Sequence, residues 1–162
     1  MNRLNPLLAA LLLAAMSLTA VTGVHAADTA PAPAAAADSL AGARALIADN
    51  KWVAAIEELK RVDAKDNADW NNLMGYSHRK AKTPDYAAAE RYYDAALALN
   101  PKHRGALEYS GELFLMIGDL PRAEQRLATL DKACFLPCSE YTDLKNAITR
   151  FKANGNRVAA QN

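Results

Sequence analysis

The chain is poor in residues that carry redox or metal chemistry. Its 162 residues include only two cysteines, Cys134 and Cys138, and three histidines, His25, His78 and His103. A structural zinc site takes about four nitrogen or sulfur ligands, and His78 and His103 are far from both cysteines in the sequence. We therefore predict no metal site, although two thiolates alone could hold Cu(I).

Catalytic signatures are also missing. The chain has no glycine-rich phosphate loop, no HExxH pattern, and no arrangement of a nucleophile, a base and an orienting group. Its acidic residues are spread at helical spacing, as on solvent-facing surfaces. The sequence therefore predicts a protein that is not an enzyme and needs no cofactor.

The N-terminus has the features of a secretory signal peptide over residues 1–26. Arg3 is followed by an apolar run at 7–15 and by a small-x-Ala pattern that ends at Ala26. The run is too short to span a membrane comfortably, and no cysteine marks a lipid anchor. We expect the mature chain to begin at Ala27 in the bacterial periplasm, or as a secreted protein, with no membrane insertion.

Excess charge is absent from the expected mature chain. Removal of Arg3 leaves 18 basic against 18 acidic residues, and a neutral chain argues against non-specific nucleic-acid binding. Residues 27–38 are rich in alanine and proline and are expected to be flexible. Residues 39–154 have the size of one domain, followed by a tail at 155–162.

Three segments of the domain align without gaps at a period of 34 residues: WVAAIEELKRV (52–62), YAAAERYYDAA (86–96) and LPRAEQRLATL (120–130). Four columns recur: Trp52, Tyr86 and Leu120; Ala55, Ala89 and Ala123; Leu59, Tyr93 and Leu127; Val62, Ala96 and Leu130. They lie on one face of a helix, and the small second column allows a close helix crossing. A turn and another helical stretch, at about 39–48, 68–82 or 103–117, precede each segment.

These residues resemble the tetratricopeptide repeat family. The middle unit has Trp70-x2-Leu73, Gly75 one place late, Ala89-x3-Tyr93 and Pro101. The third keeps Gly111, Phe114, Gly118-Asp119 and Ala123-x3-Leu127, and the first is degenerate. The resemblance implies an all-α solenoid of three helix-turn-helix repeats, at about 39–66, 68–101 and 103–133.

Beyond the repeats we expect a capping helix at 139–153. Tyr141, Leu144, Ile148 and Phe151 form its apolar stripe, and Ser139 can cap its N-terminus. A solenoid needs such a terminal element to cover the exposed end of the stack. In the middle repeat the turn around 82–84 is about two residues longer than its counterparts. His78 is expected to be a packed core residue rather than a ligand.

The resemblance also implies a function. Tetratricopeptide domains present the inner face of each repeat's first helix to a peptide or protein. Here that face would carry Asn72, Tyr76, Arg79, Lys80, Glu108, Glu112, Leu115 and Met116. We expect a groove that is positive in its middle and negative toward its C-terminal side, with Tyr76 as aromatic anchor and Arg79 and Lys80 steering an acidic segment.

The sequence therefore predicts a non-catalytic interaction or scaffold module of the cell envelope that binds a peptide or partner protein. A homodimer is also possible. The alternative is a factor that handles metal or thiol redox chemistry through Cys134 and Cys138.

Cys134 and Cys138 lie at the joint between the last repeat helix and the capping helix, where Pro137 forces a turn. An oxidising compartment and an even cysteine count favour a disulfide. Their spacing differs from the Cys-x-x-Cys of redox enzymes. We predict a disulfide, with free thiols and a metal pair as the remaining alternatives.

Overall fold

The computed structural model describes residues 38–157. The predicted signal peptide, residues 27–37 and the end of the tail lie outside the described residues. Within this range the chain forms seven helices and no strand, as the sequence predicts. The helices are α1 (Ala41–Ala48), α2 (Trp52–Val62), α3 (Ala68–Lys80), α4 (Tyr86–Leu99), α5 (Arg104–Met116), α6 (Leu120–Ala133) and α7 (Ser139–Ala153).

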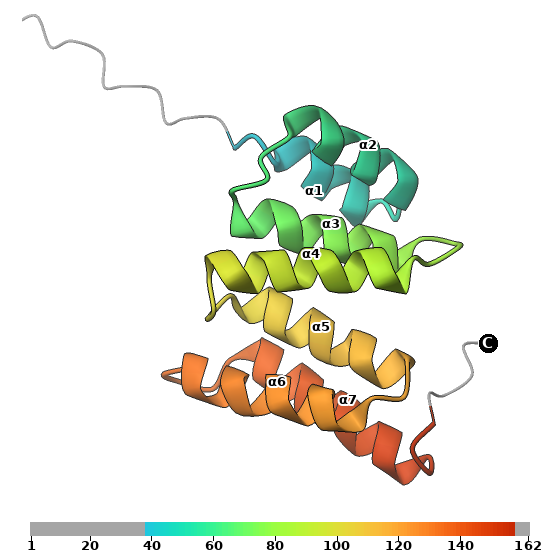
Figure 1. Cartoon of the computed structure of the whole chain (residues 1–162), viewed down its shortest axis with the longest axis vertical. Coiled ribbons are helices and arrows are strands. Elements are labelled where there is room, and N and C mark those ends of the chain that lie inside the picture. Colours follow the sequence, from blue (N-terminus) through green and yellow to red (C-terminus); the bar gives the residue numbers. More distant parts are fainter. Residues whose placement is uncertain (1–37, 158–162) are drawn as a thin grey trace, which may run out of the picture. The chain divides into compact units, whose positions relative to one another are not determined.

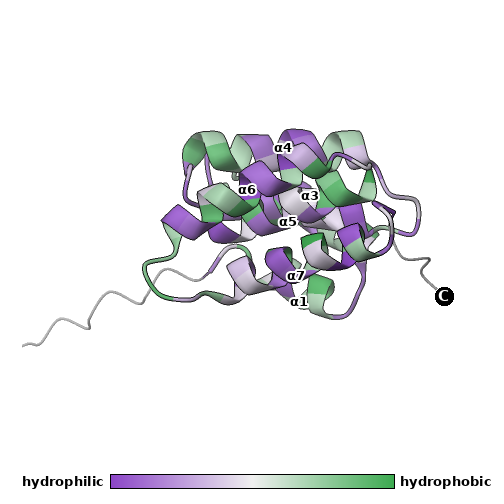
Figure 2. Ribbon diagram, turned by 90° about the horizontal axis from the view of Figure 1, so that it is seen from below, coloured by the Kyte–Doolittle hydropathy of each residue, from purple (hydrophilic) through white to green (hydrophobic). Residues whose placement is uncertain are grey.

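The helices are stacked as hairpins. In Figure 1, the pairs α1/α2, α3/α4 and α5/α6 follow one another along the long axis, and α7 packs on the last pair. The first helix of each hairpin contacts the first helix of the next, so α1, α3, α5 and α7 form one layer. Seen along the stack, α4 and α6 lie on one side and α1 and α7 on the other (Figure 2).

The repeated small residues lie where helices cross. Ala55, Ala89 and Ala123 are all completely buried, which confirms the alanine column. Gly75 allows α3 to approach α4 closely, because a Cβ there would come within 2.7 Å of the Tyr93 ring. Gly111 has the same role between α5 and α7, where a Cβ would come within 2.6 Å of Leu144. Small residues thus set the spacing between helices.

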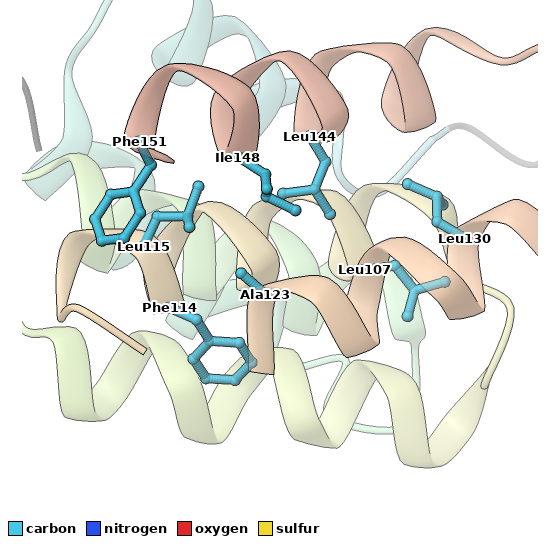
Figure 3. Packing of buried hydrophobic residues seen from close by; sticks show 8 residues of the cluster. All are labelled: Leu107, Phe114, Leu115, Ala123, Leu130, Leu144, Ile148 and Phe151. Carbon is cyan, nitrogen blue, oxygen red and sulfur yellow. The ribbon is translucent and has the colours of Figure 1, made fainter. Parts of the chain in front are cut away.

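The apolar stripe of α7 closes the C-terminal end of the core. Figure 3 shows Leu144, Ile148 and Phe151 directed at α5, where Leu115 lies between the two helices. This confirms the packing expected of a capping helix. The expected cap residue is wrong: Ser139 is the first helical residue, and Cys138 holds the N-cap position without a side-chain hydrogen bond.

Polar contacts through Asp69 join neighbouring hairpins. The Asp69 carboxylate accepts hydrogen bonds from Arg44 at 3.2 Å and from Nε2 of His103 at 2.9 Å. Nδ1 of His103 accepts from the N–H of Ala106 and so caps α5, which places the ring proton on Nε2. The hydrogen bond from His103 lowers the pKa of Asp69. Asp69 therefore contacts side chains of both adjacent repeats.

The connection between α3 and α4 differs from the other two hairpin turns. It runs from residue 81 to 85, whereas the turns at 49–51 and 117–119 are two residues shorter, as predicted. The short turns use left-handed backbone at Asn50 and Gly118, with φ of 57° and 81°. The longer loop returns to the helix through the N–H of Asp85, which donates to the carbonyl of His78 at 3.1 Å.

None of the helices in the described range combines the length and apolar character needed to cross a membrane.

Candidate functional site

An open groove lies where α3, α5 and α7 end. Its walls come from the last residues of these helices, from the 81–85 loop and from the segment after α7. The groove has a volume of about 980 Å³, which is within the range of sites that hold several side chains of a ligand. We call it the α3–α5–α7 groove.

The floor of the α3–α5–α7 groove is apolar. Leu115 and Met116 come from α5, and Ala147 and Phe151 come from α7. Leu115 and Phe151 are at the same time part of the C-terminal core, and Figure 3 shows the two side chains next to each other. Core packing therefore holds the floor in place.

The rim of the groove is basic. Lys80, Lys82, Arg150 and Arg157 line it and are exposed. None of the four forms an ion pair within the part of the chain that the structure describes, whereas most basic residues outside the groove do, such as Arg126 with Asp94 at 2.7 Å. Four uncompensated cations around an apolar floor give this groove a positive potential.

The acidic residue of the groove, Glu112, is used inside the domain. Its carboxylate pairs with the Arg79 guanidinium at 2.8 Å, and the Arg79 side chain is only 6% exposed. The guanidinium also lies 5.4 Å from the ring centre of Tyr76 and 5.5 Å from that of Tyr109. Arg79, which we expected to steer an acidic segment of a ligand, is instead packed inside the domain, because α5 lies against this face of α3 and covers it.

Tyr76 lies outside the groove lining. Its ring is half-buried and packs edge-on to Trp52 at 5.7 Å and against Tyr109 at 4.7 Å. Burial raises the pKa of Tyr109 to about 12. This aromatic stack joins α2, α3 and α5, so Tyr76, which we expected to be the aromatic anchor of the groove, is part of the packing between helices instead.

Glu108 and Asn72 are also buried. Burial, together with the nearby carboxylates of Glu112, Asp143 and Glu140, raises the pKa of Glu108 to about 8. Glu108 therefore adds no exposed negative charge to the surface. The C-terminal side of the α3–α5–α7 groove carries Arg150 and Arg157, so this groove lacks the negative side that we expected of the binding face.

Of the eight residues predicted for the binding face, the structure brings five together in the groove: Arg79, Lys80, Glu112, Leu115 and Met116. The contributions of the longer loop and of α7 to the groove were not predicted from the sequence. Two features of the sequence could have indicated these contributions. The loop at 82–84 is about two residues longer than its counterparts, and α7 follows the α5/α6 hairpin in the place where the first helix of another repeat would lie.

The two cysteines form a disulfide at the other end of α7. Cys134 and Cys138 are joined with a Cα–Cα distance of 6.0 Å, which is within the range for disulfides. Phe135 and Leu136 in the closed loop are exposed to solvent. Among residues 38–157, no three metal-ligating side chains cluster.

His78 packs against α4 at the edge of the repeats. Its ring is half-buried and stacks on Tyr92 with 5.5 Å between ring centres. Burial lowers its pKa, so the neutral imidazole is favoured. This agrees with a packing role.

Comparisons with known proteins support the repeat assignment. A family model described as tetratricopeptide repeat matches residues 84–148, from the end of the long loop into α7. No curated protein and no solved structure matches the chain. The matched region covers the hairpin α5/α6 together with the helices on either side of it. The helical repeat together with this match over residues 84–148 supports a tetratricopeptide repeat protein.

Proposed function

We propose that the protein is a non-catalytic interaction module that binds a partner protein in the α3–α5–α7 groove. Tetratricopeptide repeats generally mediate protein–protein interaction. The observation that carries the proposal is the groove itself, which combines an apolar floor with a basic rim. Binding sites of this kind gain affinity from the floor, and orientation and association rate from the charged rim.

The proposed location is the bacterial cell envelope. The sequence features of residues 1–26 support export, and a disulfide is typical of oxidising compartments. Fractionation of the source cells and N-terminal sequencing of the purified protein test this part. A mature N-terminus at Ala27 outside the cytoplasm is the expected result.

Site-specific photocrosslinking tests the binding surface. A photoreactive amino acid at Ala153, an exposed residue of the groove wall, should crosslink to one segment of one partner protein. The matched control is Ala54, an exposed alanine of α2 outside the groove. Crosslinks of equal yield to the same segment from both positions would contradict the groove as binding surface. Self-crosslinks alone would instead indicate a homodimer.

A further inference from the structure

From the charge and shape of the α3–α5–α7 groove, we infer that its ligand is an acidic segment of a partner protein with an apolar residue at its centre. This inference rests on the proposed function and names the chemical class of the partner. It follows from three properties of the groove: the sign of its free charges, the polarity of its floor and the direction of the helices that end there.

The free charges are all positive. Lys80 and Arg150 lie in the last turns of α3 and α7, where basic residues also stabilise a helix C-terminus. That explanation does not extend to Lys82 and Arg157, which lie in loops beyond the helix ends. The groove acid, Glu112, is already paired with Arg79. A ligand with several carboxylates would therefore complement the rim.

The direction of the helices argues against a compact anion such as a phosphate group. Phosphate sites use the free N–H groups of helix N-termini. The α3–α5–α7 groove is bordered by the C-terminal ends of three helices, where carbonyl groups carry partial negative charge. One helix N-terminus also borders it, that of α4 at Tyr86, but the Asp85 carboxylate already caps this end by accepting from the N–H of Ala88. Anionic groups are therefore best held away from the floor, by the long side chains of the rim.

The apolar floor sets the second requirement. Met116 and Ala147 are partly exposed in the groove above the buried Leu115 and Phe151. A wholly acidic ligand would leave this surface in contact with water, whereas a leucine or phenylalanine between two acidic stretches would cover it. An acidic segment with a central apolar residue would pair its carboxylates with the rim and bury its apolar side chain on the floor.

Fluorescence anisotropy with synthetic peptides tests the inference on the purified mature protein. The probe is a short labelled peptide, acetylated and amidated, with a central leucine flanked by glutamates. It should bind, and its affinity should fall as the salt concentration rises from about 50 to about 300 mM. A peptide with alanine in place of the leucine should bind more weakly, and a peptide with lysines in place of the glutamates should not bind.

Charge reversal locates the binding. The double variant Lys80→Glu/Arg150→Glu should weaken peptide affinity by about tenfold or more. The matched control Arg91→Glu/Lys102→Glu has the same change in net charge at exposed residues outside the groove, and it should stay within about twofold. Circular dichroism checks that both variants fold, and Lys80→Gln/Arg150→Gln gives an independent measure of the same loss.

Equal weakening in the groove and control variants would overturn the inference, because the peptide would then respond to net charge alone. Absence of peptide binding would also overturn it, although a crosslinked partner at Ala153 would leave the proposed function intact. Vesicles of anionic phospholipid and single-stranded oligonucleotides are run as competitors. Stronger binding of either one through Lys80 and Arg150 would contradict a protein partner.

Discussion

The Arg79–Glu112 pair makes a prediction that distinguishes this structure from a simple surface groove. Removing the carboxylate with Glu112→Gln leaves a cation whose side chain is only 6% exposed. Breaking a fully buried pair in this way costs about 3–5 kcal/mol. Glu112 is itself 29% exposed, and glutamine can still accept a hydrogen bond, so we expect about 2 kcal/mol of destabilisation.

Removing the cation instead of the carboxylate should destabilise the domain less. Arg79→Met removes the buried charge and fills the same space between Tyr76 and Tyr109 with a flexible apolar side chain. The remaining carboxylate of Glu112 can still contact water. We expect a loss of about 1 kcal/mol, and about the same for the double variant Arg79→Met/Glu112→Gln. The coupling energy of the double-mutant cycle should therefore be about 2 kcal/mol.

Urea denaturation followed by tryptophan fluorescence measures all three variants. The matched control is the pair Arg61 and Glu58 on α2, in which the Arg61 side chain is 73% exposed. Its cycle should give a coupling energy of at most about 0.5 kcal/mol. If Glu112→Gln has no effect, or costs less than Arg79→Met, then Arg79 is solvated in solution and the buried pair does not exist.

Three further changes test other parts of the structure. The folded-state pKa of Glu108 is about 8, against an ordinary value of 4.5. The protonated carboxyl therefore contributes stability at low pH, and this contribution is lost as the pH rises through 8. Glu108→Gln should remove this pH-dependent loss in the free energy of unfolding, which we expect to be about 1 kcal/mol after allowance for solvent screening. A parallel pH dependence in wild type and variant would contradict the raised pKa. Ala89→Leu should destabilise the domain by about 1–3 kcal/mol, because Ala89 is completely buried where two helices cross and a larger side chain would overpack the site; an unchanged melting curve would refute the repeat register. Cys134→Ser should cost at most about 2 kcal/mol, since the disulfide closes a very short loop; two thiols that react in the native wild-type protein would favour a thiol or metal function instead.

The fold could be predicted from the sequence because its packing repeats. Ala55, Ala89 and Ala123 face the same kind of helix crossing three times, so the same size constraint recurs at a fixed interval. A signal that appears in every repeat is visible in a single sequence. The apolar stripe of α7 was predictable for a related reason, since its periodicity requires a partner surface.

The details of the binding face could not be predicted in the same way. The sequence pattern identifies which residues lie on the inner side of α3 and α5, but not how closely the two helices approach each other. Arg79 and Glu112 are on different repeats, and whether they pair or face solvent depends on that distance. Helical periodicity gives the direction of a side chain, whereas its burial depends on the neighbouring repeat.

The position of α7 explains how one helix serves both stability and the proposed binding. Leu144 and Ile148 face the core, where they close the end of the stack. Arg150, in the last turn, faces the groove. Phe151 belongs to both sets, since it is buried in the core and forms part of the groove floor. The helix that caps the solenoid therefore has a second effect: its apolar contacts with α5 also fix the position of Arg150 in the groove. Stability and recognition are therefore separable at Arg150 but coupled at Phe151.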